Sequence, residues 1–397
     1  MQFRTKRLLI GAAAVAAIGG TCVAHPGHPP IPTPTITVAQ KQQPVAFELF
    51  RGNRIIVPAR INGHDTQVLL DTGASMTTLN RDYARSIGVP SGFKIQARGA
   101  GGTTEAEMVS GLTLDLGGLK IANASAGVMD LGPIEQSIGR PITAVFGRDI
   151  FNAGVVSIDW AKKRLVIRSH ESFKASAAAM PLELTKKGPF NTIQVSIAGA
   201  APIEALLDLG NGGALMLPRT YWGDRPELNG LRSAAADAGG VGGMGSAHAV
   251  MIPQVTLAGA SFAAVPAVLS DSGSDNDPAQ MANVGIGLLK QFKIDLDLGR
   301  DRIYLTPRSD KPAFDRDRAG VRFNLTGDRL KAAFVSAEGP AAAAGLKLDD
   351  EIIAVDGRKV TAAYYEAADW TRGPAGRKVV LTRADGSKVT VTLADYF

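Results

Sequence analysis

Alternating and continuous apolar runs along the chain predict β-strands more often than helices. Arg54–Ile61 and residues 66–70 are apolar runs separated by Asn62-Gly63, a dipeptide typical of a two-residue β-hairpin turn. Phe190–Ile197 and Ile203–Leu207 repeat the arrangement later in the chain. Helical signals are short, as at 81–87. The pattern predicts a mainly β protein.

The two hairpin patterns belong to an internal repeat. The first copy of the repeat is Val68-Leu69-Leu70-Asp71-Thr72-Gly73-Ala74, and the corresponding second copy is Ala205-Leu206-Leu207-Asp208-Leu209-Gly210-Asn211. The two aspartates lie 137 positions apart. Gly147 follows Val145-Phe146 and Gly285 follows Asn283-Val284; these two glycines are 138 positions apart, as are Asp159 and Asp297. Several signals that share nearly the same offset indicate two duplicated lobes. We place them at 45–170 and 182–308.

A third segment, 318–397, does not follow the repeat. A short helix is predicted at 340–346, a strand and tight turn at 348–357, and a helix at 362–371. Two further strands, 379–382 and 389–393, alternate around Asp385-Gly386. This segment is therefore expected to form a separate small domain.

The amino terminus has the pattern of a secretory signal. Arg4, Lys6 and Arg7 precede an apolar run from 8 to 18, and small residues lead to Ala24. We expect cleavage after Ala24, followed by a Pro-rich linker over 25–44. The apolar run is too short for a membrane span, which needs about 20 residues. An uncleaved anchor remains an alternative.

The charge, cysteine and histidine content argue against nucleic-acid binding, thiol chemistry and metal binding. The formal charge is +6 and the one cysteine, Cys22, lies within the predicted signal. A lipid anchor at Cys22 fits the flanking residues poorly, and cleavage after Ala24 leaves no thiol chemistry. Basic residues are scattered among acidic ones, so we expect no nucleic-acid partner. Isolated His64, His170 and His248 lack zinc-site spacing, and we expect no metal or other cofactor.

Two Asp-x-Gly elements in duplicated lobes carry the candidate chemistry. Each aspartate follows an apolar strand, and the glycine two positions later permits a sharp turn. Pseudo-twofold symmetry can bring Asp71 and Asp208 to one axis, where one proton is shared because two close carboxylates cannot both ionise. The ionised group can then activate a water while the protonated group polarises a carbonyl.

The Leu69-Leu70-Asp71-Thr72-Gly73-Ala74-Ser75 stretch resembles the signature of aspartic peptidases. Val145-Phe146-Gly147 resembles the element that packs under this loop in retropepsins. The resemblance implies a single-chain, monomeric aspartic endopeptidase of two β-barrel lobes acting on proteins or peptides, with Asp71 and Asp208 catalytic. It further implies that the active-site loops contain Thr72, Gly73, Ala74, Leu209 and Gly210. Glycine-tipped flaps over the substrate would contain Gly99, Gly101, Gly102, Gly242 and Gly243. Two further glycines, Gly147 and Gly285, would support the loops.

The second loop departs from that signature. Leu209 stands where the family has Thr or Ser, and Asn211 where it has a small residue. Leu209 cannot donate the hydroxyl bond that ties the two loops together, a bond worth roughly 1–3 kcal/mol. The alternative is a catalytically degenerate peptide-binding protein that acts through its cleft and its C-terminal domain.

The glycine-rich run 239–245 also matches a dinucleotide-binding pattern at Gly240, Gly242 and Gly245. A dinucleotide-binding site of this type needs a strand before the glycine-rich run and a helix after it. Residues 233–237 do not resemble a strand, and 249–255 resemble one. We therefore expect a flap here, with a plain loop as the alternative.

The C-terminal segment is similar to bacterial PDZ domains. Pro340–Gly345 and then Leu348–Gly357, with its Val355-Asp356-Gly357 turn, carry the resemblance, which spans about 318–397. It implies capture of a peptide C-terminus at a sheet edge. Residues 322–327 lack a clear carboxylate-cradling turn, so a structural role is the alternative. Signal and PDZ pattern together favour the bacterial periplasm.

Overall fold

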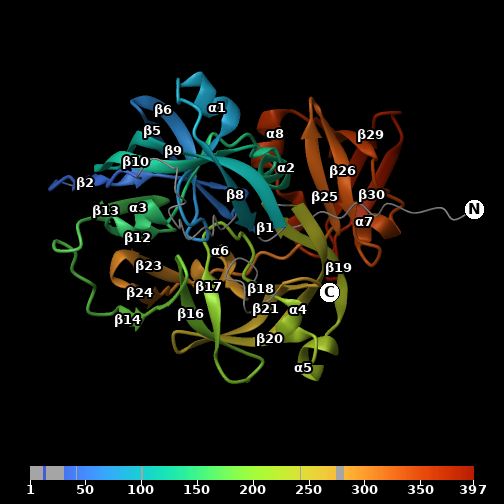
Figure 1. Ribbon diagram of the computed structural model, residues 1–397. Helices are drawn as coiled ribbons and strands as arrows, with labels where there is room; N and C mark the ends of the chain where they lie inside the picture. Colours follow the sequence, from blue (N-terminus) through green and yellow to red (C-terminus); the bar gives the residue numbers. More distant parts are fainter. Residues whose placement is uncertain (1–11, 15–30, 42, 100–101, 242, 274–280) are drawn as a thin grey trace, which may run out of the picture.

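The computed structural model describes residues 12–14, 31–41, 43–99, 102–241, 243–273 and 281–397. It is mainly β, and its strands form two nine-stranded and two six-stranded sheets (Figure 1). The described helices are short: α1 (Arg81–Ser86), α2 (Gly132–Ile138), α3 (Arg148–Asn152), α4 (Arg219–Trp222), α5 (Pro226–Asn229), α6 (Ile286–Leu289), α7 (Pro340–Ala343) and α8 (Ala362–Ala367). The predicted fold class is confirmed.

The first nine-stranded sheet is built on the predicted hairpin of β5 (Arg54–Ile61) and β6 (His64–Leu70). Asn62 and Gly63 have φ values of 50° and 82°, the left-handed backbone that a two-residue hairpin turn requires. Strand β11 (Ala144–Phe146) pairs parallel with β6 and antiparallel with β7 (Thr78–Asn80). We call residues 54–152 the first half.

The second nine-stranded sheet repeats this connectivity, and we call residues 190–289 the second half. β16 (Phe190–Ile197) and β17 (Ile203–Leu207) pair antiparallel. β22 (Asn283–Val284) then pairs parallel with β17 and antiparallel with β18 (Leu215–Leu217). Phe146 of β11 pairs with Leu70, and Val284 of β22 pairs with Leu207. Each half therefore places the corresponding strand, β11 or β22, beside its Asp-x-Gly loop.

A six-stranded sheet joins the two halves. β12 (Val155–Asp159) pairs antiparallel with β23 (Phe292–Asp297), and Ser157 lies opposite Asp295. The sheet also contains β3 (Val45–Ala46), β13 (Arg164–Arg168), β14 (Met180–Glu183) and β24 (Arg302–Pro307). One continuous apolar core extends through both halves, so burial fixes their relative position.

Each half carries a long hairpin. In the first half, β8 (Phe93–Gly99) pairs with β9 (Gly102–Leu116); in the second, β19 (Ser233–Gly240) pairs with β20 (Gly243–Leu257). The expectation that 233–237 would not form a strand was wrong. Alanine has low strand propensity, but pairing with β20 over the full length of β19 overrides it. No helix follows the glycine run, which rules out the dinucleotide pattern.

Strand β10 (Leu119–Met129) pairs with β2 (Thr35–Val38), within the range predicted to be a Pro-rich linker. This part of the linker is extended because it pairs with β10 as a strand. Strand β1 (Ala12–Ala14), inside the predicted signal, pairs parallel with β19. Other strands are β4 (Glu48–Phe50), β15 (Thr185–Lys187) and β21 (Ala260–Ser270). Among the described residues, no helix is long and apolar enough to cross a membrane.

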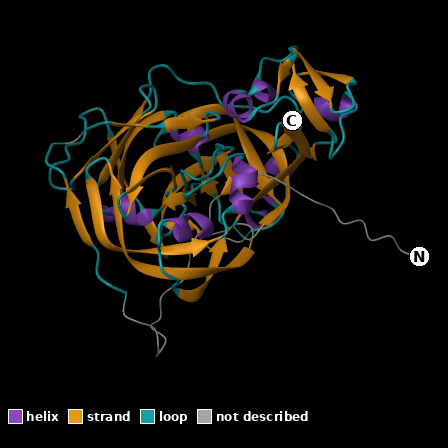
Figure 2. Ribbon diagram, turned by 90° about the horizontal axis from the view of Figure 1, so that it is seen from above, coloured by secondary structure: helices purple, strands orange, loops and turns teal. Residues whose placement is uncertain are grey.

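The C-terminal sheet has its own core, as the sequence suggested. Its strand order is β25 (Val321–Thr326), β26 (Arg329–Val335), β27 (Glu351–Val355), β29 (Lys378–Arg383), β30 (Lys388–Thr392), with β28 (Arg358–Lys359) beside β27. β25 is at the edge and has one partner strand. Figure 2 shows this sheet standing beside the two halves.

Candidate active site

Both Asp-x-Gly loops begin where a buried strand ends. The Asp71 backbone N–H donates to the carbonyl of Phe146 (3.0 Å), and the Asp208 N–H donates to the carbonyl of Val284 (3.0 Å). Each aspartate is thus fixed by the parallel strand beside its own. The two side chains are 0% and 1% exposed. Strand pairing therefore holds both carboxyl groups in the interior between the halves.

Glycine at the third loop position lets the two acids approach each other. A Cβ on Gly73 would lie 2.7 Å from an Asp208 carboxyl oxygen, and one on Gly210 would lie 2.3 Å from an Asp71 carboxyl oxygen. Real Cβ atoms do not tolerate such contacts, so each loop must carry glycine here. Each aspartate reaches across to the other loop, and, besides burial, the nearby charge of Asp208 helps to raise the pKa of Asp71.

Thr72 ties the first loop to the second. Its hydroxyl donates to the carbonyl of Leu207 (2.7 Å) and accepts from the N–H of Leu209 (2.9 Å). Leu209 has no hydroxyl that could make the corresponding hydrogen bonds to the first loop, and its side chain is fully buried in the main apolar core. The tie between the loops is therefore one-sided, as the sequence predicted.

The second aspartate has more hydrogen-bond donors than the first. The carboxylate of Asp208 accepts from the backbone N–H groups of Gly210 (2.7 Å) and Asn211 (3.0 Å) and from the side-chain amide of Asn283. Asn211 in turn donates to the Asn283 side-chain oxygen (2.7 Å). Asn211, which departs from the family signature, thus holds the residue that binds the acid.

Asp71 accepts from the N–H of Gly73 (2.7 Å) through one carboxyl oxygen. Its other oxygen, Oδ2, has no hydrogen-bond partner among the described residues. Donors stabilise an ionised carboxylate, so the imbalance favours a proton on Asp71 and a charge on Asp208.

The pKa shifts follow this imbalance. Burial, the neighbouring charge of Asp208 and the hydrogen bond to it raise the pKa of Asp71 well above its usual value. Burial also raises the pKa of Asp208, but the Asn283 amide and the backbone donors oppose it. The pair can therefore hold one proton, mainly on Asp71, while Asp208 is ionised.

The supporting glycines pack directly beneath the loops. A Cβ on Gly147 would lie 2.5 Å from the Met76 carbonyl, and one on Gly285 would lie 2.4 Å from the Gly213 carbonyl. Only glycine fits either position. Ala74, also predicted for the loop, is buried in a separate apolar cluster.

The glycines predicted for the flaps lie at hairpin ends. Gly99 pairs with Gly102, and Gly243 pairs with Gly240. Gly101 and Gly242 lie outside the described residues. Each half thus carries a hairpin whose last described pair is formed by two glycines.

Sequence reasoning missed two residues beside the dyad. Asn283 in the second copy of the repeat corresponds to Val145 in the first. A polar residue at this position of an apolar strand was the sequence signal that could have identified it. Arg54 is 6% exposed, and its guanidinium donates to the Asn53 carbonyl (2.8 Å) beside Gly212 of the second loop. Burial lowers its pKa to about 10, and the charges of both aspartates oppose that shift.

The histidines considered in the sequence lie apart from the dyad. His170 Nδ1 lies 2.6 Å from Asp297 Oδ1, and His248 Nε2 lies 3.1 Å from Asp271 Oδ1. Within the described part of the chain, no group of three or more His, Cys, Asp or Glu residues has the geometry of a metal site.

Comparison with known families agrees with this geometry. Residues 57–150 match the aspartyl protease family, and residues 334–383 match the PDZ domain family. The chain combines an aspartyl protease domain with a PDZ domain. The protease match covers the first loop, Gly147 and the β8–β9 hairpin. No curated protein matches the chain. A role in proteolysis or peptide binding follows from these two domains.

Proposed function

We propose that this protein is an exported aspartic endopeptidase in which Asp71 and Asp208 form the catalytic dyad. The observation that carries the proposal is the mutual approach of the two carboxyl groups through the space left by Gly73 and Gly210. Two aspartates whose surroundings separate their proton affinities can act as acid and base on one substrate.

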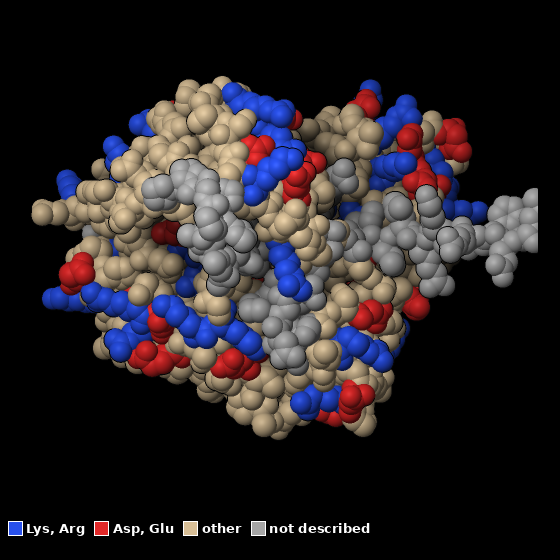
Figure 3. All heavy atoms as spheres, viewed as in Figure 1, with Lys and Arg blue, Asp and Glu red and all other residues tan. Residues whose placement is uncertain are grey.

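In the proposed reaction, ionised Asp208 takes a proton from a water held between the carboxyl groups. The water oxygen attacks the carbonyl carbon of the scissile peptide, while protonated Asp71 donates a hydrogen bond to the carbonyl oxygen. Proton transfer to the amide nitrogen then breaks the C–N bond. Since both acids are buried, substrate entry requires the β8–β9 and β19–β20 hairpins to move. Figure 3 shows a recess in the surface toward the left of the view, between the upper and lower parts of the molecule.

The test is cleavage of an unfolded protein such as casein between pH 3 and 8. The Asp71→Asn substitution should lower kcat by at least about 10²–10⁴-fold, the usual contribution of general acid–base catalysis. Asp115→Asn, at a half-buried position in β9 of the first sheet, serves as the matched control. A wild-type protein that is folded but cleaves nothing over this range would refute the proposal.

A non-catalytic peptide-binding protein is the second candidate, and Leu209 favours it because the hydroxyl exchange between the loops is one-sided. In that case, wild type and Asp71→Asn would bind casein equally and neither would cleave it. The donors around Asp208 favour catalysis instead, since a binding cleft has no need for an ionised buried acid.

Export is proposed from the sequence pattern alone. Cleavage after Ala24 would give a mature chain that begins at His25, and N-terminal sequencing of protein from the periplasmic fraction would show it. Intact Met1 on protein from that fraction would argue for an uncleaved anchor.

A further inference from the structure

The PDZ domain packs against the β19–β20 hairpin of the protease. The N–H of Ala235 in β19 donates to Glu338 Oε2 (3.0 Å), and Glu338 also accepts from the Ser336 hydroxyl (3.1 Å). Ala234 of β19 forms an apolar cluster with Tyr396 and Phe397. The second hairpin is therefore linked to the PDZ domain.

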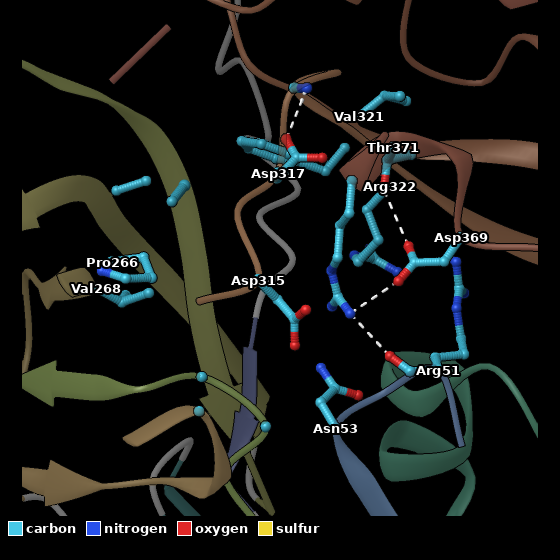
Figure 4. Close-up of a pocket in the computed structure, with 18 of the residues that line it drawn as sticks. Arg51, Asn53, Pro266, Val268, Asp315, Asp317, Val321, Arg322, Asp369 and Thr371 are labelled. Atoms are coloured by element: carbon cyan, nitrogen blue, oxygen red, sulfur yellow. Dashed lines mark hydrogen bonds and ion pairs between the residues drawn. The ribbon is translucent and has the colours of Figure 1, made fainter. Parts of the chain in front are cut away.

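A cavity of about 340 Å³ lies between these parts. Its walls come from the second catalytic loop (Gly213), the β19–β20 hairpin (Asp237) and the PDZ domain (Arg322). Figure 4 shows Pro266 and Val268 of β21 on the left of this space and Arg322, Asp369 and Arg51 on its right. Most of the remaining wall is apolar, as in ligand sites generally.

Two charged side chains of this wall have buried hydrogen-bonding atoms without a partner among the described residues. Asp237 is 7% exposed, and its Oδ2 is one of these atoms; Arg322 is half-buried, and its Nε and Nη2 are the others, while its Nη1 donates to Asn324 Oδ1 (2.5 Å). Burial raises the pKa of Asp237 to about 7, and the charge of Arg322 opposes this. Buried polar atoms are nearly always paired, so these three atoms indicate a missing partner.

Tyr365 of α8 occupies part of the β25 edge where a PDZ ligand strand would pair. Its hydroxyl donates to the Phe323 carbonyl of β25 (2.8 Å), and the Arg51 guanidinium lies 4.7 Å from its ring centre. The cavity extends beyond this point to Arg322 and to Asp237 of the protease hairpin.

Strand β1 shows that β19 can receive an added strand. Ala12–Ala14 pair parallel with Ala238–Gly240, directly after Asp237. These residues fall in the predicted signal segment, so a mature chain that begins at His25 would leave this edge of β19 unpaired. An unpaired strand edge is a template for another extended chain.

The ligand must complement an acid and a base together. A carboxylate would satisfy Arg322 but would repel Asp237, and an ammonium group would do the reverse. A peptide group carries a C=O acceptor for Arg322 and an N–H donor for Asp237 without net charge. Apolar side chains of the same segment match the apolar wall.

We propose that this cavity is an exosite that binds an internal, extended, apolar segment of the protein substrate, jointly through Arg322 and Asp237. The proposal rests on the proposed peptidase function. A long unfolded polypeptide would occupy the exosite and the catalytic cleft at once, and the shared β19–β20 hairpin would couple the two.

The kinetic test compares two substrates, casein and a ten-residue peptide that spans one casein cleavage site. Arg322→Gln should raise KM for casein roughly tenfold and leave kcat/KM for the short peptide unchanged. Arg329→Gln, on the next strand and bonded to exposed Glu351, is the control. Equal losses on both substrates, or none on either, would overturn the exosite.

A binding test separates this inference from the proposed function. Fluorescein-labelled casein is titrated with the Asp71→Asn protein, and anisotropy gives Kd without any cleavage. Adding Arg322→Gln or, separately, Asp237→Asn should weaken binding roughly tenfold, whereas amidating the casein C-terminus should change nothing. Unchanged Kd in both double variants would refute the exosite even if wild type proves to be a peptidase. Dependence on the free C-terminal carboxylate would refute the internal segment.

Discussion

The two Asp-x-Gly loops have the same backbone arrangement but different hydrogen-bond partners around their acids. In the first, Asp71 accepts one backbone N–H and the neighbouring Thr72 supplies the tie to the other loop. In the second, Leu209 is an apolar core residue and Asp208 accepts two backbone N–H groups and the Asn283 amide. The two loops thus have similar backbone geometry, while the surroundings of their acids differ.

This divergence has a chemical consequence. A symmetric pair of acids shares its proton equally until substrate breaks the symmetry. Here the donors around Asp208 favour its ionised form, and the bare Oδ2 of Asp71 favours its protonated form. The difference therefore favours one protonation state for each aspartate before substrate binds: protonated Asp71 as the acid and ionised Asp208 as the base. Each prediction below changes the surroundings of one of the two aspartates.

Among the variants that change the surroundings of the two acids, Asn283→Val should have the largest effect; it places in the second half the residue that the first half has at Val145. Loss of the amide removes a donor that lowers the pKa of Asp208, so that pKa should rise. Because the base must be ionised, the acid limb of the kcat/KM profile should move to higher pH. A lost hydrogen bond to a charged group, about 1.5–3 kcal/mol, predicts a rate roughly 10–100-fold lower. The pH–rate profile measures both.

Asn229→Ala is the control, since Asn229 bonds only the Gly223 carbonyl at the surface (2.7 Å). An acid limb that stays in place in Asn283→Val, with a rate equal to that of wild type, would show that Asp208 is not the base. A shift to lower pH would contradict the sign of the argument.

A smaller effect, on stability, is expected from Thr72→Val. Valine keeps the shape but leaves the Leu207 carbonyl and the Leu209 N–H without their partner in a buried site. The free energy of unfolding should fall by about 1–3 kcal/mol, as measured by urea denaturation. Thr256→Val, whose hydroxyl bonds Ser261 at the surface, should change it by less than about 0.5 kcal/mol. Equal losses in the two variants would mean that the tie between loops adds no stability.

Local patterns in the sequence predicted much of this site. The hairpin turn at Asn62-Gly63 and the shared offset of Asp71 and Asp208 needed only residue spacing and backbone conformation. Strand β19 was missed because alanine and glycine carry no strand signal by themselves, and pairing with β20 decides their conformation. Local reasoning has no access to that pairing.

The partners of the dyad were harder to predict. Asn283 is distant from Asp208 in sequence and meets it only through the parallel pairing of β17 and β22. Arg54 begins a strand whose apolar pattern gave no reason to expect burial of its guanidinium. The packing of the PDZ domain against β19 depends on side-chain contacts such as Glu338 with Ala235, for which no sequence pattern exists.

The smallest effect is expected from Leu209→Thr, which restores the hydroxyl that the second loop lacks. Symmetry with Thr72 places the new hydroxyl within reach of the Leu70 carbonyl and the Thr72 N–H, a gain of about 1 kcal/mol. Loss of part of a fully buried leucine costs about 1–2 kcal/mol, so the free energy of unfolding should change by less than about 1 kcal/mol. If the donors around Asp208 already compensate for Leu209, kcat/KM should stay within about threefold of wild type. A tenfold or larger gain in kcat/KM would show instead that Leu209 had impaired the dyad. The two loops would then differ because the second has degenerated, and the division into acid and base would have to be abandoned.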